Sequence, residues 1–376
     1  MSSALLDMSR LRPCNRRKNE DFTLMLNRKL RLELWPQNEV PICTCGKHMD
    51  RFGDHVMSCR CHCKTPLHNT IRDGLWDLFK DLFTTVRLTS TPNTIAREPE
   101  RIVKELPGTR PFDISVLFDP LIDESAWRVR LLQLGFDVTI VSSKPVYSTS
   151  TRTARINEIN LRLRKGEKDK FQRRGKTDRK TGITLTGDQI IGKILDQNMA
   201  LLPIAVSPHG RIGSLFRRFL YGEDPMPLPD FCETRPRAKE AARLVTSDRV
   251  PRGLLPRANF IWKKEHPECF YGGSYKAMDP WSYFDQQLGF VISTAISSHI
   301  LRAHNKNQSN APICCPGAAE CDHCHFNDDE LFELDPVANP LPPPTDVHTS
   351  VLSPDTRPTD SFVDDYQPRY VTVNHR

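Results

Sequence analysis

A short group of cysteine and histidine residues constrains the fold of this chain more than any other feature of its sequence. Its four members follow the spacing C-x-C-x9-H-x3-C and are Cys43, Cys45, His55 and Cys59. Zinc is bound by four such ligands in a tetrahedron, and Gly46 and Gly53 allow sharp turns between them. A segment this short would hardly fold without a metal. The spacing therefore predicts a zinc site, and a site closed by four protein ligands is structural rather than catalytic.

The other cysteines leave the ligand set open. Five of the 12 cysteines lie within residues 43–63 and four within residues 314–324, and clustered cysteines in an intracellular chain indicate metal before disulfide. Cys61, His62 and Cys63 are further candidate ligands of the first group, and a run of reduced cysteines without a metal is the alternative. The second group has two possible interpretations, another zinc site or an exposed, oxidisable patch. Its members are Cys314, Cys315, Cys321, His323, Cys324 and His325.

Length and composition limit the number of domains and the compartment. With 376 residues, of which 38% are hydrophobic and 26% charged, the chain predicts two or three domains at most and one modest core. No apolar run approaches the roughly 18 residues that span a membrane, so no membrane partner is expected. The first residues also lack the apolar stretch of a secretory signal, and we therefore expect an intracellular protein.

Positive charge is concentrated in one segment. The net charge is +7, and between residues 152 and 180 twelve Lys or Arg stand against four acids. Such a local excess is typical of a phosphate-binding surface, with a solvated basic helix and loop as the alternative. The basic residues are Arg152, Arg155, Arg162, Arg164, Lys165, Lys168, Lys170, Arg173, Arg174, Lys176, Arg179 and Lys180.

The order of apolar patterns predicts an α/β fold with a mixed central sheet flanked by helices. The predicted elements, in chain order, are an amphipathic helix over 67–83, strands near 102–103, 111–119 and 129–143, a basic helix over 156–174, a buried strand over 201–210 and a short helix over 213–222. One more helix is expected within 279–306.

The same patterns divide the chain into regions. These are a helical lead-in at 1–40, a knuckle at 41–66, the α/β domain at 67–225, an uncertain helical or irregular region at 226–334 and a poorly ordered, Pro-rich tail at 335–376.

Two aspartates on neighbouring predicted strands are candidate ligands for Mg2+ or Mn2+. Asp113 begins one strand, and Asp137 lies inside the next, where the surrounding residues are so apolar that a carboxylate needs a partner. At one sheet edge the pair could hold ions that activate water for phosphodiester hydrolysis. The alternatives are a strand-end cap for Asp113 and a buried, hydrogen-bonded carboxylate for Asp137. Candidates for a third acid and for a nearby cation are Glu98, Glu100, Lys144 and Lys168.

Several short motifs follow one another in a specific order. They are CTCGKHMDRFGDHVMSC at 43–59, LHNTIRD at 67–73, RPFDI at 110–114, FDVTI at 136–140 and EKDKF at 167–171. Over about residues 20–220 this order resembles the zinc knuckle and the restriction-like endonuclease in the C-terminal part of non-LTR retrotransposon polyproteins. His68 and Asn69 resemble the Arg-His-Asn motif of that family, with Leu67 in place of arginine.

The resemblance implies a PD-(D/E)xK-type nuclease domain that nicks target DNA, with Asp113 and Asp137 as metal ligands. Thr139 stands where simple members of this fold carry lysine, so the resemblance assigns the catalytic lysine to Lys168 or Lys170 on the later helix. Candidate nucleic-acid-binding residues are His68, Asn69, Arg162, Arg164, Lys165, Arg173 and Arg174.

The resemblance also implies partners and a location. DNA and element RNA are the expected nucleic acids, and a separately encoded or lost reverse transcriptase is the expected protein partner. A DNA substrate implies a nuclear protein, and without that substrate we expect a cytoplasmic one. The alternative function is a catalytically inactive, nucleic-acid-binding remnant of a retroelement.

Overall fold

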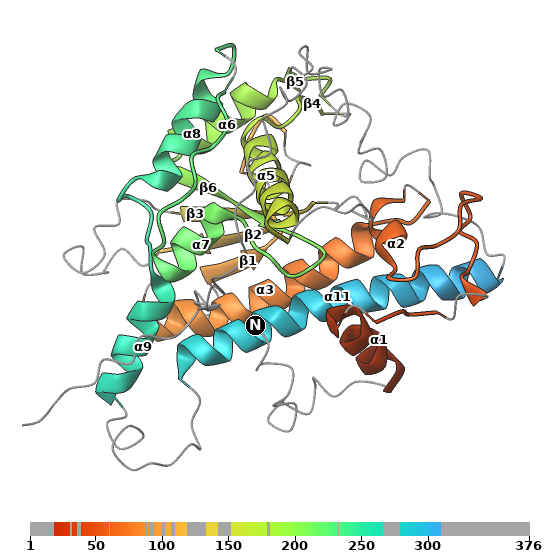
Figure 1. The fold of residues 1–376 in the computed structure, drawn as a ribbon. Coiled ribbons are helices and arrows are strands. Elements are labelled where there is room, and N and C mark those ends of the chain that lie inside the picture. Colours follow the sequence, from red (N-terminus) through yellow and green to blue (C-terminus); the bar gives the residue numbers. More distant parts are fainter. Residues whose placement is uncertain are drawn as a thin grey trace, which may run out of the picture. The chain divides into compact units, whose positions relative to one another are not determined.

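In the computed structural model, a mixed four-stranded sheet with the strand order β1-β2-β3-β6 carries the core of the described residues (Figure 1). Its strands are β1 (Ile95–Arg97), β2 (Ile114–Leu117), β3 (Gln133–Ile140) and β6 (Met199–Val206). β2 pairs antiparallel with both β1 and β3, and β6 pairs parallel with β3. The predicted α/β class with a mixed sheet flanked by helices is therefore confirmed. Every residue of β6 is buried, as expected for a strand covered on both faces.

The structure describes residues 19–309 except for short gaps. The gaps are residues 31, 36–38, 60, 88, 90–93, 100–101, 107–109, 119–132, 142–151, 179–180, 232 and 266–278. Glu100 and Lys144 fall in these gaps, and the second Cys/His group and the Pro-rich tail also lie outside the described residues. All described residues belong to one unit of the chain, Met1–Phe326.

One of the predicted strands is misplaced. Ile102 and Val103 were expected to lie in a strand, but they lie in a turn, with both side chains buried. The strand that pairs with β2 is β1, which occurs earlier in the same apolar segment. Burial of an Ile-Val pair therefore reflects packing against the core here, and not membership of the sheet.

Five phenylalanines join one face of the sheet to two helices. They come from α3 (Thr65–Thr85), β3 and α7 (Ser214–Tyr221), and their ring centroids lie between 4.6 and 6.3 Å apart. The residues are Phe79, Phe83, Phe136, Phe216 and Phe219. Tilted and edge-to-face contacts of this kind add to the free energy gained from burial. The predicted amphipathic helix is α3, and its apolar stripe faces the sheet.

The opposite face of β3 is covered by α5 (Arg152–Phe171), the basic helix of the sequence. Gly166 makes this contact close, because a Cβ atom there would lie 2.7 Å from Val141 and 3.2 Å from Thr139. The helix thus connects β3 to the parallel strand β6 while packing on both. Asp137 points to the α5 side and Phe136 to the α3 side, as neighbours on a strand must.

In the region 226–334, which the sequence left uncertain, the described residues form the helices α8 (Pro236–Thr246), α9 (Leu254–Glu265) and α11 (Pro280–Ser309). The long helix α11 packs along α3, and the contact depends on Gly74, where a Cβ atom would lie 2.4 Å from Val291. At its other end α11 contacts α1 (Asn19–Leu30) and α2 (Asp54–Ser58) (Figure 1). Among the described helices, none is both long and apolar enough to cross a membrane.

A buried glutamate of α5 caps the start of α7. The Glu167 carboxylate is fully buried and accepts hydrogen bonds from the Leu215 N–H (2.9 Å) and the Ser214 hydroxyl (3.1 Å). Burial raises the pKa of Glu167 to about 7, although these two donors and Arg164 lower it. The carboxyl group therefore satisfies free N–H groups of α7 but is desolvated in its charged form.

We expect Glu167→Gln to remove part of the pH dependence of stability. The folded pKa of about 7 lies above the ordinary value of 4.5, so the stability that this group contributes is complete below pH 4.5 and lost as pH rises through 7. The difference in free energy of unfolding, variant minus native, should therefore be larger at pH 8 than at pH 4.5 by up to about 3 kcal/mol. Urea unfolding of both proteins at the two pH values measures this, and equal differences at both values would contradict it.

Candidate metal centre and acidic site

The predicted zinc ligands lie on a tight turn and a short helix. The turn at Gly46 (φ 81°) is closed by the Cys43 N–H, which donates to the Lys47 carbonyl oxygen at 2.8 Å. His55 lies in α2, which begins after Gly53 (φ 72°), and Cys59 follows the last residue of that helix. Both glycines adopt the left-handed conformation that favours glycine, as their places in the spacing predicted.

The four predicted ligand atoms converge. The Sγ atoms of Cys43 and Cys59 are 3.6 Å apart, Cys45 Sγ lies 3.3 Å from His55 Nε2, and all four atoms lie within 4.8 Å of one another. Zn–S bonds of about 2.3 Å in a tetrahedron place ligand atoms roughly 3.8 Å apart, so these separations fit an ion at the centre. Among the described residues this is the one such group of three or more histidine, cysteine or acidic side chains. The group could hold a metal such as zinc.

The protonation states of these ligands depend on whether a cation is bound. Burial raises the pKa of the Cys43 and Cys59 thiols, and burial lowers the pKa of His55. For Cys45, burial also raises the pKa, but the N–H of Lys47 and other neighbours outweigh it and the net shift is downward. Buried thiols without a cation are therefore held protonated, and metal binding would release their protons.

His62 is a neighbour of this group rather than one of its four converging ligands. Its Nε2 lies 3.2 Å from Cys43 Sγ, and its ring meets the His299 ring of α11 edge-on, with centroids 6.5 Å apart. Burial lowers the pKa of His299 to about 4, so the His299 ring is neutral at pH 7. Groups that contact a ligand atom from outside the ligand set help to orient it in metal sites. Cys61 and Cys63, the other surplus candidates, are partly buried.

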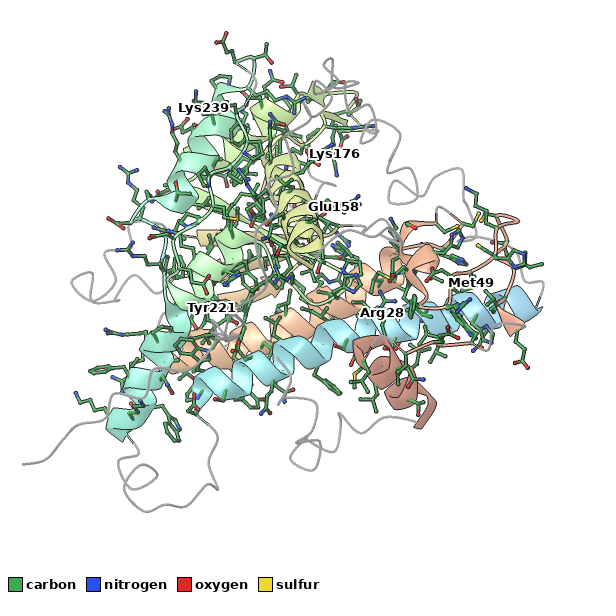
Figure 2. All side chains as sticks on the ribbon, in the orientation of Figure 1. Arg28, Met49, Glu158, Lys176, Tyr221 and Lys239 are labelled. Atoms are coloured by element: carbon green, nitrogen blue, oxygen red, sulfur yellow. The ribbon has the colours of Figure 1, made fainter. Side chains whose placement is uncertain are left out.

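The N-terminal helix is tied to this metal-ligand group by a buried ion pair. Arg28 of α1, which is labelled in Figure 2, donates to the Phe52 carbonyl oxygen at 2.7 Å and to the Asp54 carboxylate at 2.9 Å. Both side chains are almost fully buried. Since each charge is compensated by the other, removing either one would leave a buried charge alone.

The two predicted aspartates lie at one end of β2 and β3, between α3 and α5. The Asp113 N–H donates to the Phe136 carbonyl oxygen at 2.9 Å, and its carboxylate accepts the Val138 N–H at 2.6 Å. The backbone and side chain of Asp113 therefore contact β3 on both sides of Asp137. His68, on the first turns of α3, places its Nε2 3.1 Å from the same carboxylate.

Asp137 is held by two cations, Lys170 of α5 and Arg173, which lies two residues after the end of that helix. Lys170 Nζ lies 2.6 Å from one carboxylate oxygen and an Arg173 nitrogen 2.9 Å from the other. Arg173 also donates to the Pro111 carbonyl oxygen at 3.0 Å, which connects this ion pair to the segment before Asp113. The arrangement thus brings together two carboxylates, one lysine, one arginine and one histidine.

The charges of this acidic site are mutually dependent. Burial raises the pKa of Asp113, but His68, Lys170 and the Val138 N–H outweigh it and lower the value to about 2. Burial lowers the pKa of His68, yet its hydrogen bond and charge interaction with Asp113 dominate and the net shift is upward. Asp113 is therefore ionised at any pH near neutrality, which a metal ligand requires.

Other predicted site residues lie elsewhere. Lys168 donates to the Asp230 carbonyl oxygen, and its Nζ lies 5.8 Å from the centroid of the Phe231 ring. Glu98 pairs with Arg72 and Arg110, so its side chain is neutralised by two arginines. The structure therefore places Lys170, and neither Lys168 nor Glu98, beside the two aspartates.

The predicted nucleic-acid-binding residues divide by exposure. Lys165 and Arg174 are exposed, whereas the other five candidates are half-buried. Arg162 pairs with Glu158 at 2.6 Å, and Arg164 donates to the Pro227 carbonyl oxygen. The roles that sequence reasoning missed are those of His68 and Arg173, which contact the aspartates. The motif LHNTIRD marked His68 but did not indicate its partner.

Comparison with known proteins returned no relative. No family model matches the chain, no curated protein matches it, and no solved structure matches it.

Proposed function

We propose that this chain is a retrotransposon-derived, metal-dependent DNA endonuclease that nicks target DNA. The observation that supports it most is the convergence of Asp113, Asp137 and Lys170 at one end of a mixed sheet. Two carboxylates and a lysine are the groups that metal-assisted phosphodiester hydrolysis uses. The order of the motifs and the α/β class of the fold agree with this proposal.

In the proposed reaction Asp113 and Asp137 hold Mg2+ or Mn2+. Such an ion would supply the activation of water and the stabilisation of charge on the leaving oxygen. Asp113 stays ionised through His68, and the two oxygens of Asp137 retain acceptor capacity besides their contacts with Lys170 and Arg173, since each oxygen accepts about two hydrogen bonds. Lys170 supplies a fixed positive charge where the phosphate develops negative charge.

The Cys/His group has a structural role in this proposal. We assign zinc to it, because three sulfur ligands and one imidazole nitrogen suit that ion. The zinc knuckle lies directly before α3, whose first turns carry His68 and Asn69, and it contributes nucleic-acid binding. DNA and element RNA are the proposed nucleic acids, a separately encoded or lost reverse transcriptase the proposed protein partner, and the nucleus the proposed location.

A second candidate is a catalytically inactive nucleic-acid-binding remnant. Two observations favour it, and the first is that both oxygens of Asp137 already contact cations. In addition, among the described residues Glu98 is neutralised by Arg72 and Arg110 and brings no third carboxylate to the aspartates. Such a protein would keep the basic residues that bind DNA but would not hydrolyse phosphodiester bonds.

Nicking of supercoiled plasmid by the zinc-loaded full chain tests the proposal. With Mg2+ or Mn2+ we expect nicking by the native protein and none by Asp137→Ala, because the variant loses a metal ligand. Nicking by both proteins would mean a contaminating nuclease and would remove the support for this site. No nicking by either, with salt-sensitive DNA binding retained, would establish the inactive DNA-binding protein instead.

A further inference from the structure

A small basic hairpin follows α5 directly and carries no role in the proposed hydrolysis. It consists of β4 (Lys176–Thr177) and β5 (Thr184–Leu185), which pair antiparallel. The pairing places Lys176 opposite Leu185 and Thr177 opposite Thr184. This hairpin, residues 174–185, forms a two-stranded sheet separate from the central one (Figure 1).

The turn of the hairpin is held by one buried acid. The Asp178 carboxylate accepts hydrogen bonds from the Thr181 N–H at 2.8 Å and the Thr181 hydroxyl at 3.1 Å. The Asp178 N–H donates to the Ile183 carbonyl oxygen at 2.9 Å, and Gly182 adopts φ 69°. The single acidic side chain of the hairpin is therefore buried and hydrogen-bonded to Thr181.

The base of the hairpin is fixed close to the acidic site. A Cβ atom at Gly187 would lie 1.6 Å from the Arg173 carbonyl oxygen, and one at Gly175 would lie 2.7 Å from the Leu185 carbonyl oxygen. Arg173 at the same time pairs with Asp137. The two ends of the hairpin therefore pack closely together, directly after the residue that pairs with Asp137.

The outer surface of the hairpin is exposed and positive. Residues 174–177 and 181–184 are all exposed, and the sequence of 174–185 holds four basic residues against the buried Asp178. Two of the four, Arg174 and Lys176, lie on the described strands and their base. The other two, Arg179 and Lys180, lie outside the described residues.

We propose that this hairpin contacts duplex DNA beside the site of hydrolysis, with Arg174 and Lys176 on the phosphates. A two-stranded antiparallel ribbon fits the major groove, and basic side chains neutralise the backbone on either side. The proposal deepens the endonuclease function and rests on it. It assigns to the hairpin the positioning of the duplex, and to Asp113, Asp137 and Lys170 the chemistry.

The double variant Arg174→Ala/Lys176→Ala tests this surface. Binding of the full chain to a labelled duplex, without divalent metal, is measured by fluorescence anisotropy over a series of salt concentrations. We expect the slope of log K against log salt to fall in magnitude by about 1.8, for two lost phosphate contacts, and binding to weaken about tenfold. The charge-conserving variant Arg174→Lys/Lys176→Arg should restore most of the slope.

A matched control distinguishes the effect of this surface on DNA binding from the effect of net charge alone. Lys239→Ala/Lys264→Ala removes the same charge from exposed residues of α8 and α9, and Lys239 lies on a different element from Lys176 (Figure 2). It should leave the slope unchanged. An equal loss in both double variants, no loss in the hairpin variant, or a loss seen with single-stranded RNA but not with the duplex would each overturn the proposal. Because the assay needs no hydrolysis, a failure of nicking leaves this result readable.

Discussion

Replacing Lys170 by methionine is expected to lower metal-dependent plasmid nicking by at least about a hundredfold, a typical effect of removing one charge-stabilising group. The same replacement at Lys168 should leave the rate within about twofold. The reason is geometric, since Lys170 Nζ lies 2.6 Å from Asp137, whereas Lys168 donates to the Asp230 carbonyl oxygen. Initial nicking rates of the two variants, measured side by side with the native chain, provide the test.

The pair of variants controls for charge and for folding. Each removes one positive charge from the same helix, so a nonspecific loss of DNA affinity would affect both equally. Thermal unfolding of each variant shows whether the chain is still folded, and Arg173 continues to hold Asp137 in Lys170→Met. If Lys168→Met loses nicking and Lys170→Met retains it, the assignment of the acidic site is wrong.

The choice between these lysines was left open by the sequence, although one signal for it was present. Successive residues of an α-helix are about 100° apart, so residues 168 and 170 point in nearly opposite directions. Gly166, four residues before Lys170, packs against Thr139 and Val141 of the sheet. A glycine inside a polar helix indicates close backbone packing, and it marks the face that carries Lys170.

Local features of the fold were predictable and long-range ones were not. The convergence of the four candidate ligands was predictable because their spacing is short, and α3 was predictable because its apolar residues recur at helical spacing. By contrast, α11 packs along α3 from more than 200 positions later in the chain, and it buries polar side chains such as Ser297 and His299. Its apolar face is weakly marked in the sequence, so only the tertiary contacts identify its role.

The pairing of Asp113 with His68 was equally hidden. The two residues are 45 positions apart, and each had been given a separate role, one as metal ligand and one in nucleic-acid binding. Their contact depends on where α3 begins relative to the sheet. That start lies at Thr65, six residues after the last predicted zinc ligand, so the metal centre and the acidic site are joined by a short piece of chain.

Replacing Cys59 by serine is therefore expected to remove the bound zinc and to destabilise the N-terminal part of the structure by several kcal/mol. Cys59 is buried, and its Sγ lies 3.6 Å from that of Cys43, so the shorter, harder oxygen of serine would take the place of a converging sulfur. The helix α2 has five residues, too few to be stable without the ion. Zinc content of the purified full chain and its thermal unfolding with and without a chelator measure both effects.

Cys61→Ser is the matched control, because Cys61 is two residues away and does not belong to the converging group. It should keep the zinc content and the melting temperature of the native protein. Loss of zinc in Cys61→Ser, with retention in Cys59→Ser, would show that the ligand set is wrong. If Cys59→Ser also loses nicking while Cys61→Ser retains it, the start of α3 and the contact of His68 with Asp113 depend on the metal. Zinc would then be required for the acidic site without touching it.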